Sequence, residues 1–480
     1  NALNITLTGF ITDTNSSNNL ATVTFTAPDT TGVLVNATTP TISSVTKPTN
    51  ATYIIGQNLD FIVNYSENVT VTGSPTLALT IGVTPRTATY LSGSGTTALT
   101  FRYTVPTNDV DTDGIIATSP LALSGGTIKS ALALNASLTF TPPTMTSVFV
   151  DGDDPNVTAT LLPTNSLYTV NNVSWTFRAT FDQPVTVVGT PRWVLNVGGT
   201  TRFATYTSGS GTTQLNFVST INAADLDLDG IALGNSGLID LNAGTIRDAN
   251  GNDAQLSLNS PTVSGIFLTF PGMLGWYDLD VPSTVNSVVC GVNTCAAGVT
   301  DRTGSGYDLT QTGTPQPFYS ASGFSSGNRG HLRFDNANDF MNVTTVMPAI
   351  RTQIIAFQTE PATMTIQDLF FSSVGGTNTR IQITAAGALS YGTVTTAAFS
   401  KNGAALSAPA TTGAAALVAN TPYILVIQYA ANQTVPSVQR VGNTNFGGRI
   451  AEMMSFTNNA LTAGQITSIV NYLNAKHVVY

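Results

Sequence analysis

One stretch of the sequence occurs twice. Residues 69–115 and residues 185–231 share the same succession of short apolar runs, turns and acidic positions, and 185 − 69 = 116 residues separate the copies throughout. An internal repeat constrains the architecture before any other signal, because each copy must form the same structural unit. The sequence therefore predicts two similar modules in tandem.

Apolar and polar residues alternate within each copy, which is typical of half-buried strands. Between the alternating runs lies Ser-Gly-Ser-Gly-Thr-Thr, at 92–97 and again at 208–213, where glycine permits the positive φ angles of a hairpin turn. Each copy is thus predicted to be a β-meander within an all-β module. The alternating positions are Leu77, Leu79, Ile81, Leu99, Phe101 and Tyr103 in the first copy and Trp193, Leu195, Val197, Leu215 and Phe217 in the second.

The repeat divides the chain into four predicted segments. Two β-sandwich modules are expected at 41–154 and 155–270, each with roughly seven to nine short strands. Residues 1–40 match the back half of a module in pattern: an apolar start, a Gly, a turn, two alternating strands and a closing Pro. Residues 271–480 follow a different pattern and are expected to form a separate domain.

The half module at 1–40 needs a partner. Its expected strands carry Ile5, Leu7, Val23 and Phe25, and two strands alone are marginally stable and expose unpaired edges. Either upstream sequence supplies the missing half, or the segment adds to a sheet of another subunit. Head-to-tail addition does not close on itself, so it would build a filament of like subunits.

The composition disfavours a nucleic-acid partner, and the start of the sequence suggests a secreted protein. Charged residues are 9% of the chain and the net charge is −9, so the basic patch that a nucleic-acid partner requires is missing. No apolar run reaches the roughly 18 residues that span a bilayer. The sequence starts without Met and without a basic segment before an apolar run, so we expect the product of a secreted precursor.

The cysteine content agrees with that compartment. Cys290 and Cys295 are the only two, in CGVNTC, and we expect them to form a disulfide in an oxidising space. Two free thiols are the alternative. A zinc site is disfavoured because two more ligands would be needed and the only histidines are His331 and His477.

Each repeat carries a D-x-D-x-D-G sequence. Alternating carboxylates followed by a glycine can wrap oxygen atoms around a hard cation such as Ca²⁺. The match to an EF-hand loop is incomplete, since the position of the bidentate Glu is Pro120 in one copy and Ser236 in the other. Solvated acidic turns are the alternative. The predicted calcium ligands are Asp109, Asp111 and Asp113, and Asp225, Asp227 and Asp229.

The two kinds of segment resemble known families. Glu67-Asn-Val with TVTGSP, GSGT and D-x-D-x-D-G-I resembles bacterial Ig-like repeats, which occur in tandem in large surface proteins. Four segments of 271–480, namely GMLGWYDLDVPSTV, VTDRTGSGYDLTQTGTPQPFY, HLRFDNANDFMNV and FGGRIAEMMSFTNNALTAGQITSIVNYLNAKH, resemble in their order the LamG-like, concanavalin A-like jelly rolls of bacterial extracellular proteins. That resemblance implies that Trp276 belongs to a core strand.

One helix is predicted near the C-terminus. Thr462 with Gln465 three residues later forms a capping-box pattern. An apolar stripe follows at helical spacing, and we expect it to dock on the jelly roll. The stripe consists of Ile466, Ile469, Val470 and Leu473.

The sequence offers little for catalysis. The E-x-D-x-x-E motif of jelly-roll glucanases is missing, Glu360 and Glu452 stand alone, and neither histidine lies near a nucleophile elbow. We therefore expect a non-enzymatic extracellular structural protein of the cell surface, a stalk or filament subunit that binds like subunits or other surface proteins. The alternative is a glycan-binding adhesin that uses the C-terminal domain, with aromatic side chains facing a sugar. The candidates are Trp276, Tyr307, Phe318, Tyr319 and Phe340, although burial is the simpler role for Trp276.

Overall fold

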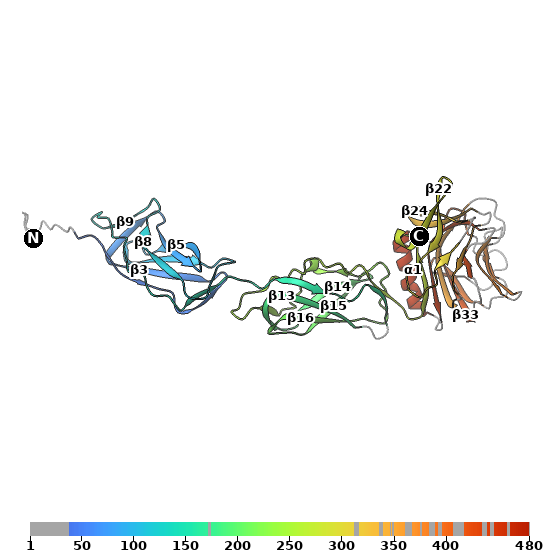
Figure 1. Cartoon of the computed structure of the whole chain (residues 1–480), viewed down its shortest axis with the longest axis horizontal. Coiled ribbons are helices and arrows are strands. Elements are labelled where there is room, and N and C mark those ends of the chain that lie inside the picture. Colours follow the sequence, from blue (N-terminus) through green and yellow to red (C-terminus); the bar gives the residue numbers. More distant parts are fainter. Residues whose placement is uncertain are drawn as a thin grey trace, which may run out of the picture. The chain divides into compact units, whose positions relative to one another are not determined.

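The fold is all-β, as predicted. The computed structural model describes residues 38–479, with gaps at 171–173, 312–315, 336–338, 346, 348–349, 361–366, 375–376, 384–388, 392–395, 407–416, 434–438, 442–445 and 458–460. Within them, mostly antiparallel sheets precede a single α-helix (Figure 1), and no helix is long and apolar enough to cross a membrane. The predicted assembly strands lie outside the described residues; their positions are Ile5, Leu7, Val23 and Phe25.

The first repeat forms a sandwich. One sheet has the order β1-β3-β6-β5-β4-β8, with β9 also paired to β3, and a smaller sheet has the order β2-β10-β7. The strands are β1 (Ile42–Thr46), β2 (Ala51–Ile54), β3 (Asn58–Thr72), β4 (Thr76–Ile81), β5 (Thr84–Ser92), β6 (Thr96–Thr104), β7 (Val110–Asp111), β8 (Ile116–Ala122), β9 (Thr127–Ser130) and β10 (Val148–Asp151).

The second repeat has the same arrangement. Its larger sheet has the order β11-β13-β16-β15-β14-β17, with β18 paired to β13, and β12 pairs with β19. The four central strands begin and end 116 residues after their counterparts, so the sequence repeat is also a structural one. The strands are β11 (Val157–Leu161), β12 (Ser166–Thr169), β13 (Ser174–Val188), β14 (Arg192–Val197), β15 (Thr200–Ser208), β16 (Thr212–Thr220), β17 (Ala232–Leu233), β18 (Thr245–Arg247) and β19 (Ile266–Thr269).

The alternating apolar residues face the core, as predicted. Leu77, Leu79 and Ile81 of β4 are buried while the positions between them are partly exposed. The Ser-Gly-Ser-Gly turns join β5 to β6 and β15 to β16. Gly93 and Gly209 have φ angles of 109° and 115°, and a Cβ at either would collide with a backbone carbonyl of the next strand. These two turns therefore require glycine.

One pair of core residues is exchanged between the repeats. Leu59 lies directly opposite Tyr103 across β3 and β6, and at the same two positions Trp175 lies opposite Ser219 across β13 and β16. All four residues are buried. The first module thus pairs a medium side chain with a large one, and the second pairs a very large side chain with a small one. The two pairs therefore fill a similar volume in the core.

The C-terminal domain is built on one long, folded sheet. Its order is β30-β29-β28-β34-β26-β23-β22-β24-β25-β35-β27-β33-β31-β32, while β20 also pairs with β35 and β21 with β22. Aliphatic and aromatic side chains from these strands form its core. The strands are β20 (Met273–Asp278), β21 (Val285–Cys290), β22 (Asn293–Val299), β23 (Leu309–Thr310), β24 (Phe318–Phe324), β25 (Arg329–Asp335), β26 (Met341–Val343), β27 (Ile350–Thr359), β28 (Gln367–Val374), β29 (Thr377–Ile383), β30 (Leu389–Tyr391), β31 (Thr396–Lys401), β32 (Ala404–Leu406), β33 (Pro422–Gln433), β34 (Gln439–Val441) and β35 (Gly447–Thr457).

The predicted helix is α1 (Ala463–His477). Thr462 caps it: its side chain accepts a hydrogen bond from the backbone N–H of Gln465, and the Gln465 side chain accepts one from the backbone N–H of Thr462. The stripe residues Ile469, Val470 and Leu473 are buried against the domain, as predicted.

The chain separates into two compact units. One contains the first module together with Arg247–Ala254, and the other comprises Asn156–Ile246 and Gln255–Tyr480. Within the first unit, the backbone N–H of Ile55 donates to Asn252 Oδ1 at 3.1 Å, and Asn250 Nδ2 donates to Asp151 Oδ2 at 2.6 Å. The segment Arg247–Ala254 thus completes one end of the first module by hydrogen bonding.

Candidate functional site

The first carboxylate of each acidic loop forms an ion pair inside its own module. Asp109 receives both Arg86 Nε, at 2.9 Å to Oδ2, and the hydroxyl of Tyr103, while Asp225 pairs with Arg202. Burial alone would raise the pKa of Asp109, but the hydrogen bonds from Arg86 and Tyr103 outweigh burial and hold it below its ordinary value. Each carboxylate therefore ties its loop to the β4–β5 or β14–β15 hairpin.

The second carboxylate of each loop accepts backbone hydrogen bonds. Asp111 receives the N–H of Gly82 at 2.7 Å, and Asp227 receives the N–H groups of Gly198 and Gly230, both at 2.7 Å. Burial, with a smaller contribution from the neighbouring Asp229, raises the pKa of Asp227 to about 7.

The third carboxylates, of Asp113 and Asp229, are exposed. The structure thus places all six predicted calcium ligands in the two loops. The first two carboxylates of each loop, however, already accept hydrogen bonds from their own module. Across the described ranges, no three His, Cys, Asp or Glu side chains gather as a metal site would require. Calcium binding stays a prediction.

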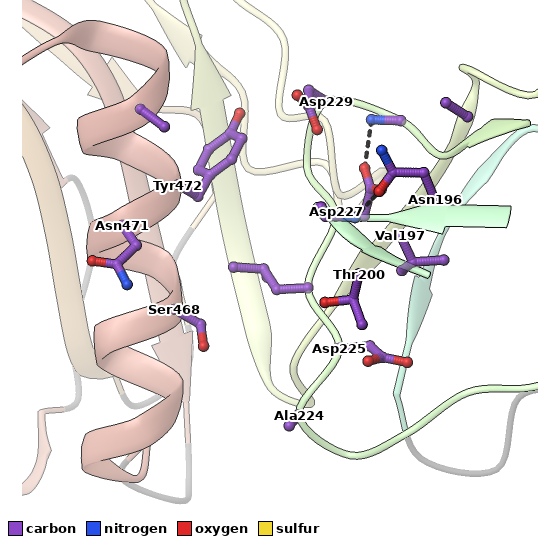
Figure 2. Close-up of a pocket in the computed structure, with 16 residues that line it drawn as sticks. Asn196, Val197, Thr200, Ala224, Asp225, Asp227, Asp229, Ser468, Asn471 and Tyr472 are labelled. Carbon is purple, nitrogen blue, oxygen red and sulfur yellow. Dashed lines mark hydrogen bonds between the residues drawn. The ribbon is translucent and has the colours of Figure 1, made fainter. Parts of the chain in front are cut away.

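The second loop borders a cavity of about 590 Å³ (Figure 2). Asp225, Asp227 and Asp229 lie on one side, with Asn196 and Thr200 from the β14–β15 hairpin. On the other side are residues of α1 that the apolar stripe does not use: Ser468, Asn471, Tyr472 and Ala475. The cavity is therefore polar, and it lies where the second module meets the helix of the C-terminal domain.

An arginine and two aromatic rings join the second module to the C-terminal domain. The rings of Phe267, in β19, and Trp276, in β20, are 5.8 Å apart in an edge-to-face arrangement. The Arg302 guanidinium lies 4.5 Å from the first ring and 3.9 Å from the second. Phe270, in the short connection between these strands, is fully buried. Stacking of a cation on two rings favours one arrangement of this junction.

A cluster of buried charges lies next to that junction. Glu452 of β35 accepts hydrogen bonds from Trp276 Nε1 at 2.7 Å and pairs with His477 Nε2 at 2.8 Å and Lys476 Nζ at 3.0 Å. Asp278 of β20 pairs with Lys476 Nζ at 2.6 Å and with Arg302 Nη1 at 2.5 Å. Asp278 and Glu452 lie directly opposite each other in the register of β20 with β35.

Glu360 and Glu452, which stand alone in the sequence, both have partners in the structure. Glu452 and His477 contact each other and are both fully buried, and Glu360 pairs with Arg333 at 2.9 Å and Arg449 at 3.0 Å. Burial lowers the pKa of His331 to about 4, so this histidine is neutral at physiological pH. The pairing of β20 with β35 and the position of α1, which sequence spacing does not reveal, bring the cluster together.

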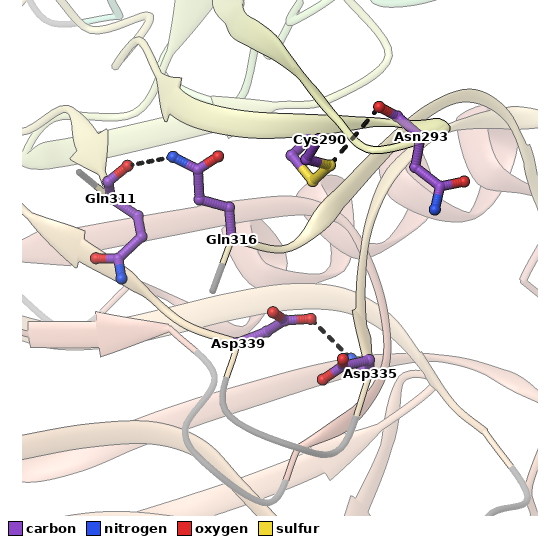
Figure 3. Close-up of a disulfide and its surroundings, with 7 residues drawn as sticks. Cys290, Asn293, Gln311, Gln316, Asp335 and Asp339 are labelled. Atoms are coloured by element: carbon purple, nitrogen blue, oxygen red, sulfur yellow. Dashed lines mark hydrogen bonds between the residues drawn. A yellow bond between two sulfur atoms is a disulfide. The ribbon is translucent and has the colours of Figure 1, made fainter. Parts of the chain in front are cut away.

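Cys290 and Cys295 form the predicted disulfide across the β21–β22 hairpin (Figure 3). Their Cα atoms are 5.8 Å apart. The side chains of Val289 and Val292 beside the bond are 86% and 100% exposed. The disulfide therefore braces a projecting apolar hairpin.

The aromatic residues proposed for sugar binding are not equally available. Trp276 is fully buried, as its core-strand position implied, and uses its indole N–H on Glu452. Tyr307 and Tyr319 pack partly against the hydrophobic core, and Phe318 is partly exposed. The residues that would bind a sugar in a glycan-binding adhesin, the alternative function, thus stay unassigned.

Comparison with known proteins adds little to this description. No protein-family model matches the chain, and no curated protein matches it. Among solved structures, a marsupial T cell receptor aligns with 45% of this chain and 95% of its own length, at 12% identity and a TM-score of 0.17. A similarity this low carries no argument about family or function.

Proposed function

We propose that the protein is a non-enzymatic structural protein of an extracellular surface, in which tandem Ig-like modules act as a mechanical spacer for a LamG-like C-terminal domain. The observation that carries this proposal is the structural repeat: the larger sheets of both modules keep one strand order, with central strands that start and end at the same 116-residue offset. Repetition of a whole module lengthens a chain without adding a new site.

The use of polar groups supports the same function. In both modules the repeated Arg–Asp pair, Arg86 with Asp109 and Arg202 with Asp225, ties the acidic loop to a hairpin of the same module. The acidic motif thus recurs with the same internal contact. A disulfide in the C-terminal domain fits an oxidising location.

Force spectroscopy tests the spacer role. The full chain is tethered at its two ends and stretched, and the two modules should unfold in separate steps of matching length. One repeat of 116 residues should add roughly 40 nm of chain per step, at about 3.6 Å per residue. Unfolding of the whole chain at low force in a single step would refute a mechanical role.

Two further measurements separate this proposal from its rivals. Electron microscopy of the full chain and of a chain without residues 1–40 tests polymerisation, which only the full chain should show if the N-terminal strands link subunits. Glycan-array binding by the full chain would favour the adhesin instead, and release of reducing sugar from a polysaccharide would favour an enzyme.

A further inference from the structure

Three reactive groups lie together beneath the last turn of α1. Lys476 Nζ is 2.6 Å from Asp278 Oδ1 and 3.0 Å from Glu452 Oε2. The side chains of Asp278 and Glu452 are 2% and 0% exposed, and that of Lys476 is 12% exposed. An amine held against a buried carboxyl group has the proximity that an intramolecular condensation needs.

The neighbours give the two carboxyl groups different roles. Burial alone would raise the pKa of Glu452, but Lys476, His477 and Trp276 outweigh it and hold the pKa at about 2. Burial and the nearby Glu452 charge raise the pKa of Asp278 above its ordinary value despite its cationic partners. Asp278 is therefore the carboxyl group that more readily accepts a proton, and Glu452 stays an anion that orients the amine.

We propose that Lys476 and Asp278 become joined by an amide bond between Nζ and Cγ. The ammonium first gives a proton to Asp278 across their contact, leaving a neutral amine and a neutral acid. The amine attacks Cγ, and Arg302, which contacts Oδ2, stabilises the negative charge that develops there. The C–O bond to Oδ1 then breaks, and the oxygen leaves as water with the carboxyl proton and one proton of the amine nitrogen. Of the three protons on the ammonium, one stays on the amide nitrogen and the other two leave in the water. No oxidant or other reactant is consumed.

The site has room for the departing water, and the loss of two buried charges favours the reaction. Asp278, Arg302 and Lys476 all line a cavity of about 560 Å³, which offers the water a route out. Condensation replaces a buried ion pair with a neutral amide and so removes two charges from a site where desolvation is costly. The two carboxylates hold the pKa of Lys476 above its ordinary value even though burial opposes this. The neutral amine is therefore rare, and we expect slow condensation that continues after folding.

Peptide mapping of the full chain tests the bond directly. Trypsin cleaves after the flanking Lys and Arg residues, so the unlinked protein yields peptides 248–302 and 450–476. An acylated Lys476 resists cleavage, so the linked protein yields 248–302 joined to 450–480, lighter than their sum by one water, about 18 Da. Finding this branched peptide, in an amount that grows with incubation, supports the bond. Finding only free 450–476 after prolonged incubation overturns it.

Variants separate the bond from other losses of water, such as succinimide formation at an aspartate. Lys476→Arg keeps the positive charge and must abolish the branched peptide, while Lys129→Arg, in the first module, must leave it unchanged. Glu452→Gln removes the orienting anion and should slow formation at least tenfold. A branched peptide that persists in Lys476→Arg would refute the assignment. The map of the unmodified chain decides the question even if a variant fails to fold.

Discussion

The exchanged core pair of the two repeats leads to a quantitative prediction. Ser219→Tyr places a phenol against Trp175, and overpacking of this kind costs about 1–3 kcal/mol. Trp175→Leu removes a fully buried indole and its edge-to-face contact with Tyr168 at 5.7 Å, at a cost of roughly 3–4 kcal/mol. The two single changes together should therefore destabilise the second module by roughly 4–7 kcal/mol if they are independent.

The double variant Trp175→Leu with Ser219→Tyr should be much more stable than that sum. It recreates the Leu59–Tyr103 pair of the first module, and the new hydroxyl would stand six residues before Asp225, as Tyr103 stands before Asp109, with which it hydrogen-bonds. We expect the double variant to lie within about 2 kcal/mol of the original, which means a coupling energy of at least about 2 kcal/mol.

Hydrogen exchange of the full chain, read by mass spectrometry on peptides from β13 and β16, measures the opening free energy of this module alone. Ser174→Tyr is the matched control, because Ser174 is exposed in β13, next to Trp175, and it should change stability by less than about 0.5 kcal/mol. Additive effects of the two core changes would refute the idea that the repeats conserve the pair as a unit.

Three other measurements follow from the loops and the disulfide. The pKa of Asp227 is raised from 3.8 to about 7, so this carboxyl group loses its proton at lower pH in the unfolded chain than in the folded one. Its contribution to stability is therefore complete below about pH 4 and is lost as the pH rises to 7, a decline of about 4 kcal/mol at most. The variant Asp227→Asn should flatten that decline. If the acidic loops bind calcium, a chelator should lower the melting temperature, and Asp111→Ala with Asp227→Ala should erase the difference; equal melting with and without chelator would contradict binding. A thiol reagent should add no mass to the folded protein before reduction, whereas two labels would show Cys290 and Cys295 to be free.

Local patterns predicted the local structure. The period of two around Leu77 and the capping box at Thr462 depend on residues a few positions apart, so the strands and α1 follow from the sequence. The burial of Trp276 followed from the family resemblance.

Non-local pairing limited the prediction of the site. The D-x-D-x-D-G sequence suggested a cation, but it does not show that Asp109 and Asp225 lie against arginines. A signal was present, because Arg86 and Arg202 recur at the same 116-residue offset as those carboxylates. The cluster of Asp278, Glu452 and Lys476 had no such signal. The pairing of β20 with β35 brings the two carboxylates together, and α1 adds the lysine.

The buried connection between β19 and β20 decides how the chain can be divided for experiments. A fragment that ends before β20 would leave Phe267 without the ring of Trp276, and a fragment that starts at Gly272 would remove one of the two rings that flank Arg302. Either cut would expose aromatic surface that is covered in the full chain, and an exposed apolar patch promotes aggregation. Expression trials of the C-terminal domain should therefore retain the second module. Insertion of flexible residues at Phe270 should loosen the junction before it unfolds the second module or the C-terminal domain.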